Sequence, residues 1–172
     1  IGLIYGEQGN YEQALKYYGK ALEIRKETGN KMGIASSYSS IGVVYYNKGD
    51  FELAIEYYNK SLKIAEEIGD IMGMAGIYNN LGAVYIQQGS YEQALGFYGQ
   101  GLKVFEQIDN KTGMTDSYIN LGGLSLEQGN ASEAIEMGEK GLALAQEVGL
   151  IKETKAASEL LYDVYKKTDQ SA

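Results

Sequence analysis

The side chains that most often carry enzyme chemistry are absent or scattered in this sequence. There is no histidine and no cysteine, which excludes imidazole bases, thiol nucleophiles and Cys-rich zinc sites. The remaining Ser, Lys, Asp and Glu residues show no spacing that would place a nucleophile beside a base. Acidic pairs such as Glu66-Glu67 lack the Asp-rich loop spacing of a calcium site. We therefore predict that the chain is not an enzyme and uses no cofactor and no metal.

One glycine-rich stretch, GFYGQG at residues 96–101, superficially resembles a phosphate-binding loop. Such a loop must follow a strand and open a helix. Here the glycines fall inside a segment with helical periodicity, so we place them in a helix interior. Each of them is expected to weaken that helix by up to about 1 kcal/mol relative to alanine.

A sequence pattern recurs along the chain at a spacing of 40 residues, and the elements that this pattern forms must position the side chains discussed above. The recurrence is clearest at four turns, which read Gly9-Asn10-Tyr11, Gly49-Asp50-Phe51, Gly89-Ser90-Tyr91 and Gly129-Asn130-Ala131. Self-similarity at a fixed period is the signature of a solenoid, in which each repeat buries its apolar face against its neighbours. The sequence thus predicts a repeat array.

Each period is predicted to form two helices. In the second period, apolar residues at helical spacing indicate helices over 31–48 and 51–68. Gly49 and Gly69 suit the left-handed conformation that ends helices. Asn30, Asp70 and Asn110 recur as candidate N-terminal caps. The absence of proline agrees with nearly continuous helix, because proline breaks helix interiors.

The repeat resembles the tetratricopeptide repeat, a pattern of aromatic, Leu-Gly, Tyr, Ala and aromatic residues. The residues that carry the resemblance are Tyr38-x-x-Ile41-Gly42-x-x-Tyr45, followed by Ala54-x-x-x-Tyr58. The usual unit has about 34 residues, so both helices are lengthened here. The resemblance implies an all-α fold, a right-handed superhelical solenoid of antiparallel helix pairs, and a close approach of Gly42 to Ala54.

We expect a single array over residues 1–172, which begins at a point equivalent to Ile41 and has no initial Met. We read it as a fragment of a longer array. The expected divisions are repeat 1 with a truncated first helix (1–28), repeat 2 (31–68), repeat 3 (71–108), repeat 4 (111–148) and a capping helix (151–168). In the capping helix, Leu161, Val164 and Tyr165 are expected to pack inward.

The resemblance also implies that the concave face of the array is a peptide-binding groove, lined by the first helix of each pair. The residues at these positions are small, apolar or amide-bearing, and amides can both donate to and accept from a peptide backbone. The predicted groove residues are Ser36, Ser39, Ser40, Val43, Tyr46, Asn47, Gly76, Asn79, Asn80, Ala83, Ile86, Gln87, Asp116, Ile119, Asn120, Gly123, Leu126 and Glu127. Simple exposure to solvent is the alternative explanation for these positions.

Charge restricts the partners of such a groove. Some tetratricopeptide co-chaperones clamp a C-terminal carboxylate with Lys and Arg at these positions, but here no basic residue occupies them before Lys167. Glu7, Asp116 and Glu127 instead favour a neutral or basic segment. The formal net charge of −8 argues against nucleic acid and anionic membranes, which attract basic surfaces. No signal peptide or spanning segment is visible, so we expect a cytoplasmic protein without membrane insertion.

These observations predict a scaffold for protein–protein interaction that binds a peptide or helical segment of a partner in its groove. Two other functions stay open. The array could associate with copies of itself, or it could be the sensory or regulatory ligand-binding segment of a larger signalling protein.

Overall fold

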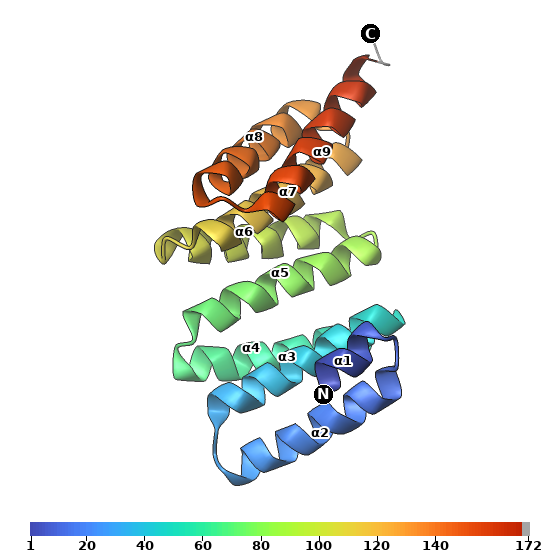
Figure 1. The fold of residues 1–172 in the computed structure, drawn as a ribbon, viewed down its shortest axis with the longest axis vertical. Helices are drawn as coiled ribbons and strands as arrows, with labels where there is room; N and C mark the ends of the chain where they lie inside the picture. Colours follow the sequence, from blue (N-terminus) through green and yellow to red (C-terminus); the bar gives the residue numbers. More distant parts are fainter. Residues whose placement is uncertain (170–172) are drawn as a thin grey trace. The chain divides into compact units, whose positions relative to one another are not determined.

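The structure, a computed structural model, describes residues 1–169, and all of its regular elements are α-helices (Figure 1). In chain order they are α1 (Gly2–Glu7), α2 (Tyr11–Glu27), α3 (Lys31–Lys48), α4 (Phe51–Ile68), α5 (Ile71–Gln87), α6 (Tyr91–Gln107), α7 (Lys111–Glu127), α8 (Ala131–Val148) and α9 (Ile151–Asp169). The predicted all-helical repeat fold is confirmed. The helices over 31–48 and 51–68 begin and end at the expected residues.

The chemistry of the turns sets these boundaries. The side chains of Asn30, Asp70 and Asn110 each accept a hydrogen bond from the backbone N–H three residues later, so all three act as the predicted caps. Gly49 and Gly69 end α3 and α4 with φ of 79° and 67°. A residue with a side chain adopts these left-handed angles only at a cost in free energy, whereas glycine does not.

The helices group into two compact units, residues 1–88 and residues 89–172. The first contains α1 to α5, and the described part of the second contains α6 to α9. The division falls between α5 and α6, inside the segment that we assigned to one repeat from the sequence. The assignment of repeats therefore stays a prediction.

In the first unit, the same contacts recur from one helix pair to the next. The rings of Tyr5 and Tyr17 stack with centroids 5.5 Å apart, and those of Tyr45 and Tyr57 stack at 5.4 Å. The residues of the second pair lie 40 positions after those of the first. Stacked aromatic pairs of this kind hold the two helices of each pair together beyond their buried area.

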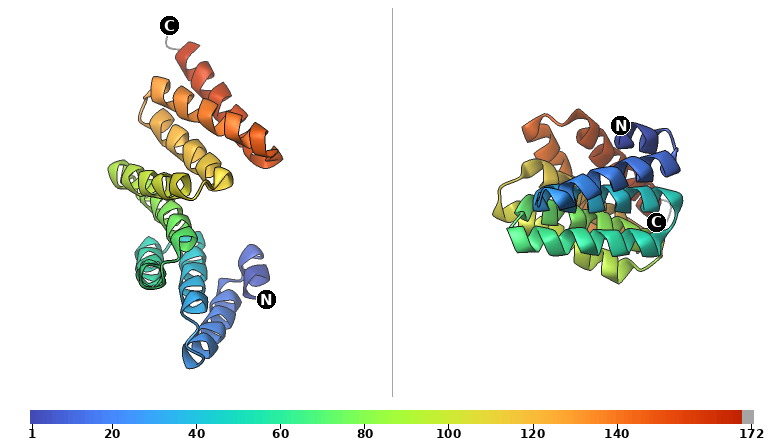
Figure 2. Two further views of the ribbon diagram at one scale, coloured as in Figure 1. Left: turned by 90° about the vertical axis from the view of Figure 1, so that its left-hand side faces the viewer. Right: turned by 90° about the horizontal axis from the view of Figure 1, so that it is seen from below.

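In the second unit, α7, α8 and α9 lie side by side (Figure 2). Leu160 and Val164 of α9 form a buried cluster with Ala134 of α8. Leu161 is also buried, but Tyr165 is 47% exposed, so its predicted inward packing is wrong. The buried stripe of α9 runs through Ala157, Leu160, Leu161 and Val164, and Tyr165 lies at its edge.

Charged residues form ion pairs on the exposed faces of α4 and α8. Lys60 Nζ lies 2.6 Å from Glu56 Oε1, and Lys140 Nζ lies 2.7 Å from Glu136 Oε1. These pairs are exposed, so screening by solvent makes their contribution to the free energy of unfolding small. None of the helices within residues 1–169 combines the length and apolar character that crossing a bilayer needs.

Candidate functional site

The predicted groove residues on α3, α5 and α7 are all at least partly exposed. They alternate with residues that hold the helices together. On α3, for example, Ile41 and Val44 are 5% and 3% exposed, whereas Val43 between them is 39% exposed. The side chains that we selected from the sequence are therefore accessible to a partner.

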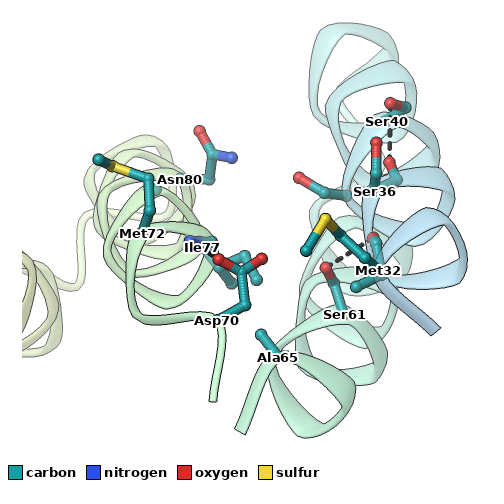
Figure 3. Close-up of a pocket in the computed structure, with 13 residues that line it drawn as sticks. Met32, Ser36, Ser40, Ser61, Ala65, Asp70, Met72, Ile77 and Asn80 are labelled. Carbon is teal, nitrogen blue, oxygen red and sulfur yellow. Dashed lines mark hydrogen bonds between the residues drawn. The ribbon is translucent and has the colours of Figure 1, made fainter. Parts of the chain in front are cut away.

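The helices α3, α4 and α5 enclose a hollow of about 290 Å³ (Figure 3). In the close-up, Met32, Ser36 and Ser40 lie on the α3 side of this space, and Met72, Ile77 and Asn80 lie on the α5 side. The hollow unites part of the predicted set, namely Ser36, Ser39, Ser40, Gly76 and Asn80.

The floor of this hollow is apolar and its walls are polar. Ala35, Ala65 and Ile77 are buried among the lining residues. Ser61 Oγ donates to the carbonyl oxygen of Ala35 at 2.7 Å, and Ser40 Oγ donates to that of Ser36 at 2.9 Å. These hydrogen bonds occupy the protons of both hydroxyl groups, so Ser61 and Ser40 are not arranged as nucleophiles.

The rim of the hollow contains residues that the sequence analysis missed. Met32 and Met72 are 63% and 51% exposed, although both are apolar, and methionine adapts its shape to irregular partners. Asp70 lies beside them in the lining, and its Oδ1 accepts from the N–H of Gly73 at 2.9 Å. The sequence does contain a signal for these residues, because Met32 and Met72 are 40 residues apart and so occupy equivalent positions in the repeat. The predicted groove began only at later turns of these helices, at Ser36 and Gly76.

Two further hollows lie along α3 in the same unit. One of about 220 Å³ is lined in part by Glu7, Ser40, Val43 and Asn47. The other, of about 490 Å³, is lined by Ile1, Gly2, Leu3, Tyr17, Tyr18, Ala21, Arg25, Ser36 and Ser40. Ser40 lines all three hollows. The exposed face of α3 is thus the common wall of the candidate site.

Other predicted groove residues of α3 and α5 do not line these hollows. The lining of these three hollows does not include Tyr46, Asn79, Ala83, Ile86 or Gln87. The ring of Tyr46 instead packs against that of Phe51, with centroids 6.1 Å apart. This contact gives Tyr46 a structural role in the turn between α3 and α4.

The predicted residues of α7 belong to the second unit. The position that a Cβ of Gly141 would take lies 3.2 Å from Cγ1 of Ile119, so Ile119 packs against α8. Much of the surface of Asp116 is exposed, but its carboxyl group is partly buried. This burial and the negative charge of Glu153 raise the pKa of Asp116, while Lys152 lowers it. Within residues 1–169, no group of acidic side chains is arranged to hold a metal ion.

Comparison with known proteins identifies the family. A family model of the tetratricopeptide repeat matches residues 1–67 and 73–147. The chain belongs to the tetratricopeptide repeat family. A comparison with curated protein sequences gave no significant match.

Several solved structures share the fold of this tetratricopeptide repeat chain. BtubC from P. vanneervenii superposes with a TM-score of 0.79 at 24% identity, covering 99% of this chain and 76% of BtubC. Aspartyl phosphate phosphatase F from Bacillus subtilis gives a TM-score of 0.92 at 20% identity, with 99% and 45% covered. A Rap protein complexed with competence and sporulation factor gives 0.83 at 17% identity, with 99% and 51% covered. The chain thus spans about half the length of the last two proteins.

Within the tetratricopeptide repeat pattern, the most recurrent residues hold helices together. A Cβ on Gly42 would lie 2.7 Å from Cε1 of Tyr58, and Tyr58 is only 2% exposed. The three atoms nearest to this Cβ position belong to the ring of Tyr58, a neighbour that the sequence analysis did not name. At the equivalent pair 80 residues later, a Cβ on Gly122 would lie 3.3 Å from the carbonyl oxygen of Ala134, so the two helices approach closely there, as the resemblance implies for Gly42 and Ala54.

Arg25 departs from the tetratricopeptide repeat register and was missed from the sequence. Its equivalents are Ala65, Phe105 and Ala145, all of them buried and uncharged. Arg25 is also the only arginine in the chain. A search for residues that break the repeat, in place of those that keep it, would have found this position.

Proposed function

We propose that this chain binds a short extended segment of another protein along the exposed face of α3, with α5 as the opposite wall. Repeat scaffolds of the tetratricopeptide family serve protein–protein interaction. The observation that carries the proposal is the hollow between α3, α4 and α5, in which serine, asparagine and methionine side chains surround an apolar floor.

The chemistry of the hollow suits a peptide backbone with small apolar side chains. Asn80 presents an amide that can donate and accept at once, and Ser36 and Ser39 add hydroxyl groups. The apolar floor and the two rim methionines suit aliphatic side chains. The carboxylates of Asp70 and Glu7 in the linings favour a neutral or basic segment next to these hollows.

We also propose that the chain acts by binding and not by catalysis. Two of the hydroxyl groups in the hollow donate to backbone carbonyls, and the remaining lining supplies no general base beside a nucleophile. Phosphatase F shares the fold, but this chain spans 45% of it at 20% identity. The activity in its name is therefore not transferred to this chain.

A regulatory role within a longer protein is the second candidate. It is supported by the similarity to the Rap protein that was solved with competence and sporulation factor. In this role, the bound segment would be a signal that alters the rest of the protein. It uses the same hollow, so the same experiment tests the binding step. Self-association stays an alternative that a single molar mass in light scattering over a concentration series would contradict.

The test is selection of binding peptides from a random displayed library, followed by affinity measurement on variants. Asn80→Ala removes the amide that faces the hollow and should weaken the selected peptides about tenfold, which corresponds to roughly 1.4 kcal/mol. Asn59→Ala is the matched control, because Asn59 is exposed on α4 outside the lining of the hollow. Equal affinity of both variants would contradict the proposal.

A second variant extends the test to the second unit. Asn120 on α7 is the residue equivalent to Asn80 one repeat later and is partly exposed. Asn120→Ala, measured by itself, tests whether the predicted groove residues of the second unit contribute to binding. The thermal midpoints of Asn80→Ala and of Asn120→Ala should each match that of the wild type, since neither side chain is buried.

A further inference from the structure

Arg25 holds a charge at a position where the other repeats bury uncharged side chains. Its Nη1 donates to the carbonyl oxygen of Gly33 at 2.9 Å and to Oγ of Ser37 at 2.7 Å. Both acceptors are neutral and lie on α3. No ion pair joins the guanidinium to an acidic side chain of the described residues.

The geometry leaves one edge of the guanidinium available. Arginine has five N–H donors in a planar fork, and the two on Nη1 are used by Gly33 and Ser37. The donors on Nε and Nη2 form no hydrogen bond to residues 1–169. These two nitrogens form an edge that matches the two oxygens of a carboxylate.

The position of this edge is fixed by packing. A Cβ on Gly33 would lie 2.8 Å from Cδ and 3.0 Å from Nε of Arg25. The side chain therefore lies flat across the first turn of α3, where Gly33 leaves room for it. Because both its stem and its Nη1 are held by α3, little conformational entropy remains to be lost when an anion binds.

The guanidinium lines the hollow of about 490 Å³ between α1, α2 and α3. Tyr17 and Tyr18 provide aromatic walls there, and Ser36 and Ser40 border both this hollow and the one beside α5. A segment bound along α3 would therefore pass from the Arg25 hollow to the Asn80 hollow without leaving the site.

We propose that Arg25 is a carboxylate-binding subsite at one end of the proposed peptide site on α3. The ligand is a carboxylate of the bound segment, either its C-terminal carboxylate or the side chain of an Asp or Glu. This subsite lies at the end of the second helix of its pair, whereas the clamp that we excluded from the sequence uses positions on first helices. The subsite therefore predicts that the bound segment carries a negative group at this point, although the rest of the segment is neutral or basic.

Arg25 itself supplies a specific readout for the test. As the only arginine, it gives a single Nε–Hε correlation in a ¹H–¹⁵N spectrum of the whole chain. We would titrate three small probes against this signal. N-acetylglycine carries a terminal carboxylate, N-acetylglutamic acid α-amide carries a side-chain carboxylate, and N-acetylglycinamide is the neutral control.

We expect a saturable shift of the Arg25 signal with at least one of the two acids, and an apparent affinity at least about tenfold higher than for the neutral amide. The acid that binds more tightly identifies the source of the carboxylate. A signal that moves equally with the amide, or does not saturate, would overturn the subsite.

Two variants separate recognition from a purely structural role. Arg25→Ala restores the side chain found at 65 and 145, so the chain should remain folded. Its Tyr17 and Ser36 backbone amides should lose the acid-dependent shifts. Lys20→Ala, at an exposed position of the same helix outside the lining, should keep them. Shifts that persist in Arg25→Ala would overturn the proposal.

The inference rests on the proposed peptide site, but the two can fail separately. Loss of peptide affinity in Asn80→Ala with an unresponsive Arg25 signal rejects the carboxylate subsite alone. A responsive Arg25 signal with unchanged peptide affinity in Asn80→Ala rejects the α3–α5 site and leaves the carboxylate subsite in place.

Discussion

Glycines inside the helices differ in how closely other side chains approach them. This difference shows which glycines are needed for helix packing and which are not. Gly42 faces the ring of Tyr58 with no room for a Cβ, and Gly122 lies against Leu160 in the same way. Gly19 has no atom within 4 Å of the position that its Cβ would take. Close packing thus requires glycine at positions 42 and 122 but not at position 19.

This contrast predicts opposite effects of the same substitution. Gly42→Ala should lower the free energy of unfolding by about 1–3 kcal/mol, because Tyr58 is buried and must move. Gly19→Ala should raise it by up to about 1 kcal/mol, because alanine is the better helix former. Urea denaturation of both variants measures the difference. A Gly42→Ala variant as stable as the wild type would show that Tyr58 is not held in place.

The raised pKa of Asp116 makes a prediction about pH. Burial and the charge of Glu153 favour the protonated form in the folded state, so the folded state binds the proton more tightly than the unfolded state does. The resulting stabilisation is present below the ordinary aspartate pKa and is lost as the pH rises through the folded-state pKa. At neutral pH, the charge of Asp116 is therefore a cost to folding.

Asp116→Asn should accordingly increase the resistance to urea at pH 7 and have a smaller effect at pH 3. Asp163→Asn is the control, because it removes the same charge from an exposed position of α9. If both variants gain the same stability at pH 7, the gain comes from net charge and not from the surroundings of Asp116.

Recurrence predicted the packing residues well and the distinctive ones poorly. Gly42 and Tyr58 recur, and both hold the core. Arg25 occurs once, so a method that aligns repeats treats it as noise, although its bonds to Gly33 and Ser37 tie α2 to α3. Tyr165 was misplaced because it lies at the edge of a buried stripe, where helical periodicity alone does not decide between burial and exposure.

At the scale of the helix, local chemistry was sufficient to set the boundaries. The caps at Asn30 and Asp70 and the left-handed glycines at 49 and 69 are properties of short segments, so the sequence contains them in full. The hollow beside α3 depends on which side chains from α4 and α5 face it, and this information is not local. Met32 and Met72 were missed for that reason.

The glycines of α6 give a prediction that concerns a whole element. Gly96 and Gly99 are exposed and have nothing within 4 Å of their Cβ positions, so they contribute flexibility without a packing contact. Replacing both with alanine should stabilise α6 by about 1–2 kcal/mol in total. Slower amide hydrogen exchange within residues 91–107 would be the direct measurement. Unchanged exchange would mean that opening of this segment does not depend on helix propensity.

At the scale of the molecule, the division into two compact units sets how a local defect spreads. In a helical repeat, each element is stabilised mainly by its neighbours. In the second unit, α9 covers α7 and α8 through Leu160, which is 8% exposed and packs with Ala134 and Val164. In the first unit, α3 and α4 are held by their own tyrosine contacts. The two units therefore have separate sources of stability.

Leu160→Ala tests this separation. The substitution leaves a cavity against Gly122 and Ala134 and should cost about 2–5 kcal/mol of local stability. Hydrogen exchange should accelerate throughout α7, α8 and α9 but remain unchanged in α2, α3 and α4, because the lost contacts lie within residues 89–169. Tyr162→Ala is the control on the same helix, since Tyr162 is 65% exposed. If Leu160→Ala accelerates exchange equally in both halves, the chain unfolds as one cooperative body and the two compact units are not independent in energy.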